Sequence, residues 1–154
     1  MSTRCRIGIK NQDETITSIY CHYDGYPEHV GKILVENYKD ETKIRKLMEL
    51  GDISSLGTEP VANPRAWEIF NQKDFSKYSE WFKKVHPDNM CDTYKTRGEK
   101  GCDAITSETL ADYYKLTDDC SGEYVYLFED NSWYVTESEK IKPELVTKVV
   151  FTEE

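Results

Sequence analysis

The sequence has no long hydrophobic run. Its apolar stretches fall well short of the ~18–20 residues that a membrane-crossing helix needs, so we expect no membrane span and no membrane partner. The first residues, Met1 to Arg6, are charged and lead directly into a strand pattern, without the apolar region or cleavage site of a signal peptide. Together these absences predict a cytoplasmic protein.

The cysteine patterns that mark disulfide frameworks and zinc sites are also missing. The five cysteines are widely spaced and include no Cys-x-x-Cys pair, and an odd number without a secretory context argues against a disulfide framework. Only Cys21 and His22 are adjacent, and neighbouring side chains of a strand point to opposite faces. Because a tetrahedral zinc site needs close pairs of ligands, we expect no metal.

The common motifs of nucleotide binding and hydrolysis are absent. There is no Gly-x-Gly-x-x-Gly, no phosphate loop ending in Gly-Lys-Ser/Thr, no Gly-x-Ser-x-Gly and no His-Glu-x-x-His. The sequence therefore predicts no cofactor and no complete active site, and we expect a protein that is not an enzyme.

Acidic residues, by contrast, are in excess, and the excess lies in the second half of the chain. The net charge is −9, with 11 Lys/Arg against 12 Asp/Glu in residues 1–77 and 9 against 17 in residues 78–154. Such a field repels nucleic-acid phosphates and favours basic partners. We therefore expect no direct nucleic-acid binding; the alternative interpretation of the charge is that it serves solubility.

The first third of the chain has clear signals of secondary structure. Residues 4–10 and 15–23, the latter rich in β-branched and aromatic types, predict a β-hairpin. A helix is expected over 28–39, where apolar residues recur at helical spacing. Asp40 is placed to cap a second helix, which Gly51 ends.

The rest of the chain mixes loops, helices and strands. The elements predicted there are a loop over 52–62, two short helices within 63–85, a strand over 90–96, a helix over 107–115, a hairpin over 123–136 and a last strand over 146–151. Strands at both ends with helices between them indicate one α+β domain, residues 1–154. Its sheet is expected to be mainly antiparallel, built from two hairpins plus additional strands and packed with three to five short helices.

The later hairpin and its flanks combine acidic and aromatic residues. Aromatic side chains anchor protein interfaces and charges steer association, so this segment predicts a partner-binding face, with ordinary solvated surface as the alternative. The residues of the predicted face are Asp118, Asp119, Glu123, Tyr124, Tyr126, Glu129, Asp130, Trp133, Glu137 and Glu139.

A second cluster of reactive residue types lies at the junction between the second strand and the first helix. His22 and Asp24 are two residues apart and share a face of a regular strand. Their pairing would orient the imidazole for general-base chemistry, or would serve only as a structural tie of the loop. With polar residues from elsewhere, the junction forms a candidate ligand loop of Arg4, His22, Asp24, Tyr26 and Arg97.

The N-terminal residues resemble a family of small phage and prophage proteins. That family reads Thr-Arg, a short strand, and Tyr-x-His-Trp-Asp-Gly-Tyr-Pro before a Gly-containing helix. This chain has Thr3-Arg4 and the run Tyr20 to Pro27, with Tyr23 where Trp is usual. The resemblance is strongest over residues 3–35. It implies a small accessory phage product made inside a bacterial cell, and it carries over no catalytic residue.

These observations lead to three functional hypotheses. The first is a small acidic phage-type protein that binds and inhibits a host protein, such as a CRISPR–Cas defence component, by occupying a basic nucleic-acid-binding surface. The second is a protein that binds a small nucleotide-like signal at the candidate ligand loop. The third is a hydrolase that uses His22 with Asp24 or Cys21.

Overall fold

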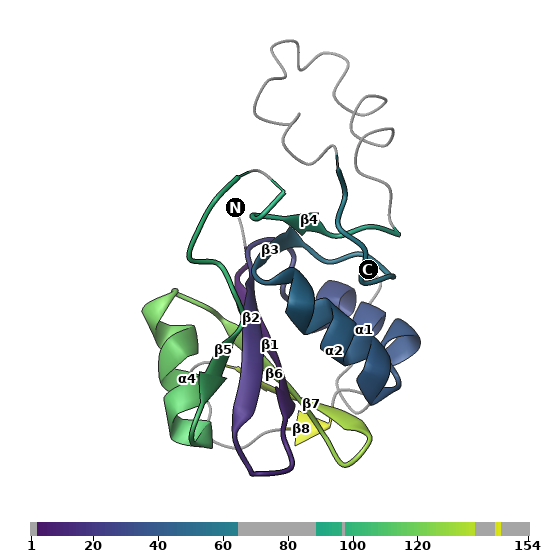
Figure 1. Cartoon of the computed structure of the whole chain (residues 1–154). Helices are drawn as coiled ribbons and strands as arrows, with labels where there is room; N and C mark the ends of the chain where they lie inside the picture. Colours follow the sequence, from purple (N-terminus) through teal and green to yellow (C-terminus); the bar gives the residue numbers. More distant parts are fainter. Residues whose placement is uncertain (1–2, 65–88, 97, 138–143, 146–154) are drawn as a thin grey trace.

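The computed structural model describes residues 3–64, 89–96, 98–137 and 144–145. The strands of these residues form a single sheet in the order β4-β3-β2-β1-β6-β7-β8, and β5 pairs with β2 outside this path (Figure 1). The strands are β1 (Cys5–Lys10), β2 (Ile16–Cys21), β3 (Ile53–Ser55), β4 (Asp92–Thr93), β5 (Ile105–Ser107), β6 (Tyr124–Glu129), β7 (Ser132–Glu137) and β8 (Glu144–Leu145).

Both predicted hairpins are confirmed. Strands β1 and β2 pair antiparallel, and so do β6 and β7. Glu129 pairs with Ser132, which leaves a two-residue turn in which Asp130 and Asn131 have φ values of 52° and 61°. Asp and Asn tolerate this left-handed conformation, and its twist matches that of the flanking strands. The turn sequence therefore fixes the register of the second hairpin.

The expectation of a mainly antiparallel sheet is wrong in part, because the sheet is mixed. The two hairpins meet through a parallel pairing of β1 with β6, from Cys5 opposite Tyr124 to Ile9 opposite Phe128. Strand β3 also pairs parallel to β2. Hairpin signals are local, whereas the direction of pairing between hairpins depends on the long crossover that connects them. The sequence signals therefore did not reveal it.

Four helical segments lie in the described residues. They are the π-helical turn η1 (Pro27–Gly31), α1 (Lys32–Asn37), α2 (Glu41–Leu50) and α4 (Leu110–Asp119). The Asp40 cap is confirmed, since its Oδ1 accepts the Lys43 N–H at 2.9 Å, and Gly51 ends α2 at φ 77°. The helix expected over 28–39 forms as η1 followed by α1.

Other element boundaries differ from the expectation. The predicted loop over 52–62 contains β3, and the helix predicted over 107–115 begins at Leu110. Thr109 caps that helix through the Asp112 N–H, while residues 105–107 pair with β2 as β5. The helices predicted after Pro64 and the strand predicted over 146–151 lie outside the described residues.

The sheet is covered on both faces. Figure 1 shows α1 and α2 on one side of the sheet and α4 on the other. Side chains of β1 and β6 alternate between the two faces. On the α1–α2 face, Ile7 and Tyr126 pack with Leu34 in the larger core, while Val125 belongs to a smaller core with Tyr113 of α4.

A glycine determines how closely α4 approaches the sheet. A Cβ atom on Gly8 would lie 2.8 Å from the Tyr113 hydroxyl, so no larger residue fits there without a shift. The Tyr113 hydroxyl donates a hydrogen bond to the carbonyl of Tyr126. Tyr113 therefore holds α4 against the centre of the sheet, and among the described residues a hollow remains between α4 and strands β6 and β7.

Candidate functional site

Two of the predicted partner-binding aromatics lie in the core, which corrects the sequence-based interpretation. Tyr126 is fully buried, and its hydroxyl donates to the Gly25 carbonyl at 2.8 Å. Trp133 is 5% exposed, and its Nε1 donates to the Tyr38 carbonyl at 2.8 Å. Tyr124 is partly buried against the same core. Burial in the core therefore makes Tyr126 and Trp133 unavailable as anchors for a partner.

The acidic residues of the predicted face form two groups rather than one. Exposed carboxylates at the end of α4 and the open end of the β6–β7 hairpin belong to Asp118, Asp119, Glu123 and Glu137, which we call the α4-end carboxylates. Glu129 and Asp130 lie at the hairpin turn, about 17 Å away for five residue steps along β6. Glu139 lies outside the described residues.

A tight turn brings the α4-end carboxylates together. After α4, Ser121 adopts φ 60° and the Gly122 N–H donates to the Thr117 carbonyl at 2.8 Å, so the chain reverses at once into β6. Glu123 then precedes β6, beside Glu137, the register partner of Tyr124. The helix end and the hairpin end therefore form one acidic surface.

Asp118 and Asp119 lie at the electrostatically unfavourable end of their helix. The last turn of α4 contains no basic residue, and its free carbonyls already carry partial negative charge. An exposed carboxylate there destabilises a helix by about 0.3–1 kcal/mol. Lys115 offsets part of this charge, with Nζ 3.4 Å from the Asp119 carboxylate. The surface is thus negative in both its side chains and its helix dipole.

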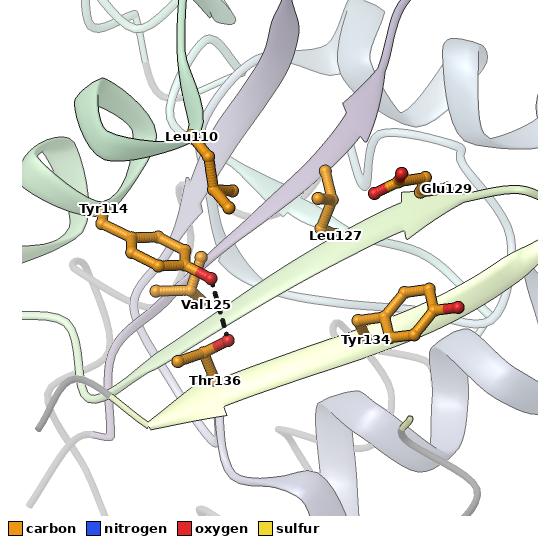
Figure 2. Close-up of a pocket in the computed structure, with 7 residues that line it drawn as sticks. All are labelled: Leu110, Tyr114, Val125, Leu127, Glu129, Tyr134 and Thr136. Atoms are coloured by element: carbon orange, nitrogen blue, oxygen red, sulfur yellow. Dashed lines mark hydrogen bonds between the residues drawn. The ribbon is translucent and has the colours of Figure 1, made fainter. Parts of the chain in front are cut away.

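A groove lies between α4 and the β6–β7 hairpin (Figure 2). Leu110 and Tyr114 of α4 form one wall, and the Tyr114 hydroxyl is 3.1 Å from the Thr136 hydroxyl across one end. Its volume is about 120 Å³, and its lining is Leu110, Tyr114, Val125, Leu127, Glu129, Tyr134 and Thr136. Sequence reasoning missed this groove, although Leu110 and Tyr114 are four residues apart on one helix face.

The opposite end of the groove adjoins a second, polar hollow. Glu129 lines both, and the hollow has a volume of about 330 Å³. Its lining residues are Lys10, Asn11, Gln12, Glu14, Glu41, Glu129 and Asp130. Carboxylates thus outnumber cations there, as they do at the α4 end.

The candidate ligand loop is organised differently from the expectation. His22 Nδ1 lies 2.6 Å from the Tyr20 hydroxyl, and Asp24 accepts a 3.4 Å hydrogen bond from the Tyr26 hydroxyl. The pairing of His22 with Asp24 stays a prediction. Asp24 has φ 57°, so the chain turns out of the regular strand on which that pairing was argued.

Gly25 connects the candidate ligand loop to the core through hydrogen bonds and close packing. A Cβ on Gly25 would lie 2.8 Å from the Thr3 carbonyl, and the Gly25 N–H donates to that carbonyl at 2.8 Å. The Gly25 carbonyl in turn accepts the Tyr126 hydroxyl. This close packing gives the Asp24–Gly25 segment a structural role at the start of β1.

Two cationic residues were assigned to the same loop. Arg4 Nε is buried and has no hydrogen-bond partner within the described part of the chain. Burial raises the pKa of the nearby Tyr20 hydroxyl above its ordinary value. Tyr20 also stacks on Tyr94 with ring centroids 6.4 Å apart. Arg97, the other predicted cation, lies outside the described residues.

The thiols of the sheet lie in an apolar environment. Cys21, named in the hydrolase hypothesis, is fully buried, with Sγ 3.5 Å from the Tyr23 carbonyl. Burial raises the pKa of the Cys91 thiol to about 11 and that of Cys5 well above its ordinary value. Cys91 and Cys5 therefore lack the lowered pKa of a nucleophilic cysteine, whose reactive form is the thiolate.

The described part of the chain contains neither a metal-binding cluster nor a membrane-spanning helix. Within residues 3–64, 89–96, 98–137 and 144–145, no cluster of three His, Cys, Asp or Glu side chains is arranged to hold a metal ion. No helix in the same ranges has the length and hydropathy to cross a membrane. Comparison with protein-family models, curated proteins and solved structures gave no match.

Proposed function

We propose that this chain is a binding protein, not an enzyme, and that its α4-end carboxylates contact a basic surface of another protein. In the context implied by its N-terminal resemblance, it is a small phage-type accessory protein in the cytoplasm of a bacterial host. It would inhibit a host protein, such as a CRISPR–Cas defence component, by occupying a basic nucleic-acid-binding surface.

One observation carries this proposal: acidic side chains gather where they oppose the folding of their own helix. Asp118 and Asp119 face the negative end of the α4 dipole, and Glu123 and Glu137 adjoin them. A surface selected only for solubility can place its carboxylates anywhere, including helix N-termini, where they stabilise. A basic partner would place positive charge beside these carboxylates. Part of the binding energy would then come from reducing the repulsion among the carboxylates and between them and the negative end of the α4 dipole.

The test is binding of a labelled peptide of alternating Arg and Ser, followed by fluorescence anisotropy. The paired variant Asp118→Asn/Glu123→Gln removes two exposed charges from the α4 end. Its matched control, Glu36→Gln/Glu49→Gln, removes two exposed charges from α1 and α2 on the other side of the sheet. Long-range attraction acts equally in both variants, whereas contact at the α4 end is lost only in the first.

We expect the α4-end variant to weaken binding by about tenfold, the equivalent of ~1.4 kcal/mol, and the control by much less. Raising NaCl from roughly 0.05 to 0.5 M should weaken the wild-type complex steeply, because exposed charges are screened. Equal losses in both paired variants, or binding that is insensitive to salt, would contradict the proposal.

A small anionic ligand is the second candidate, favoured by the buried Arg4 Nε beside Tyr20, which has no hydrogen-bond partner among the described residues. A buried guanidinium N–H without an acceptor is unfavourable, and a phosphate or carboxylate oxygen would satisfy it. Calorimetry with nucleotides, comparing wild type with Arg4→Gln, tests this candidate. Absence of heat with every nucleotide tried, or heat that Arg4→Gln leaves unchanged, would count against it.

A further inference from the structure

We propose that the groove between α4 and the β6–β7 hairpin receives an apolar side chain of the basic partner, while a neighbouring Lys or Arg of that partner enters the polar hollow at Glu129. This inference rests on the proposed function and names the segment chemistry that the protein recognises. The inference is based on the shape of the groove and on the negative charges at its two ends.

The groove has the dimensions and chemistry of a site for one aliphatic side chain. Its volume of about 120 Å³ is close to that of a small hydrocarbon group, and its lining includes the aliphatic side chains of Leu110, Val125 and Leu127. The Tyr114 hydroxyl forms a hydrogen bond with the Thr136 hydroxyl at one end of the groove, so its polar group is already satisfied there (Figure 2). Leu110 remains 39% exposed on the groove wall, and covering it would remove apolar surface from water.

The hollow at Glu129 supplies the charge that selects a basic neighbour. It contains the carboxylates of Glu14, Glu41, Glu129 and Asp130. Lys10 Nζ lies 2.9 Å from the Glu14 carboxylate and 3.2 Å from the Glu129 carboxylate, so this single ammonium group forms ion pairs with both. Arg45 is 3.1 Å from Glu41 on the rim.

The negative charge of this hollow therefore exceeds its positive charge. Asp130 is exposed at the turn and takes part in none of the ion pairs of the described residues.

The arrangement specifies the order of side chains in the partner. Because Glu129 lines both the groove and the hollow, the apolar and basic residues that fill them must be close together in the partner's chain. The α4-end carboxylates lie beyond the other end of the groove, near Thr136. A segment with an apolar residue between basic ones therefore matches all three surfaces.

The experiment uses two labelled peptides of Arg and Ser that differ only at the centre, where one has Leu and the other Ser. Affinities are measured by anisotropy with the full-length protein and two variants. Leu110→Ser removes the aliphatic side chain from the α4 wall of the groove. Ile105→Ser is the matched control. The exposed fraction of Ile105, 43%, is similar to the 39% of Leu110, and Ile105 lies on β5, outside the groove lining.

We expect wild type to bind the Leu peptide about tenfold more tightly than the Ser peptide, the order expected for burial of a Leu side chain less its ordering. Leu110→Ser should abolish this difference and Ile105→Ser should preserve it. In addition, Asp130→Asn should weaken both peptides. Circular dichroism of each variant verifies that the fold is retained.

The possible failures are distinguishable. Equal affinity of wild type for the two peptides would overturn the groove assignment, and the α4-end proposal would stand if Asp118→Asn/Glu123→Gln still weakened both. If that paired variant had no effect on either peptide, the proposed function would fail as well. Concentration-dependent dimerisation that Leu110→Ser abolishes would assign the groove to a second copy of the chain and overturn the inference.

Discussion

Replacing Asp118 with asparagine should stabilise the folded protein while weakening its binding to a basic partner. Helix α4 spans ten residues and has no basic side chain in its last turn. An exposed carboxylate at such a position is unfavourable by about 0.3–1 kcal/mol. The substitution removes that repulsion and keeps the shape of the side chain. For a chain of this length, we expect Tm to rise by about 1–4 °C, measured by circular dichroism and checked by urea unfolding.

The same helix offers a control of opposite sign. Asp112 lies in the first turn of α4, where a carboxylate faces the positive end of the dipole. Asp112→Asn should therefore lower Tm by a similar amount. Both shifts should shrink at about 1 M NaCl, where the screening length falls to about 3 Å. A fall in Tm for Asp118→Asn, or shifts of the same sign in both variants, would refute the dipole argument.

Three further predictions concern the fold around the site. Gly8→Ala should destabilise the protein by about 1–3 kcal/mol in urea unfolding, because the added Cβ collides with the hydroxyl and ring of Tyr113, and unchanged stability would rule out the collision. Tyr126→Phe should lower stability by about 1–3 kcal/mol in the same assay, since the buried Gly25 carbonyl loses its donor. Burial raises the pKa of Asp52 above its unfolded value, so this carboxyl contributes stability fully below the unfolded pKa and loses it as pH rises through the folded pKa. Asp52→Asn should accordingly stabilise the fold more at neutral than at acid pH in urea unfolding followed across pH, and the reverse trend would contradict the assignment.

Local signals predicted the elements that local interactions determine. The hairpin of residues 123–136, the Asp40 cap and the Gly51 helix end follow from turn and capping chemistry within a few residues, and all three are confirmed. Strands β3 and β5 were missed because three residues are too few to establish an alternating pattern. The parallel pairing of β1 with β6 depends on residues more than a hundred positions apart.

The candidate site was predictable only in part. Four consecutive residues of β6, Val125 to Phe128, are buried, so the strand has no apolar–polar alternation to show which face is covered. That is why Tyr126 was assigned to a surface although it lies in the core. Trp133 of β7 is also buried, which its residue type alone does not reveal. The acidic end of α4 was visible in the sequence, but the groove beside it requires the placement of Leu110 and Tyr114 over β6 and β7.

The central claim is that a basic segment binds along α4 and the β6–β7 hairpin. Nuclear magnetic resonance provides the most direct measurement, by titrating the Arg/Ser peptide with a central Leu into ¹⁵N-labelled protein. We predict that the amide shifts gather at Tyr114, Asp118, Glu123 and Leu127 and saturate together. Shifts confined to α1 and α2, or spread evenly over the sheet, would contradict the account.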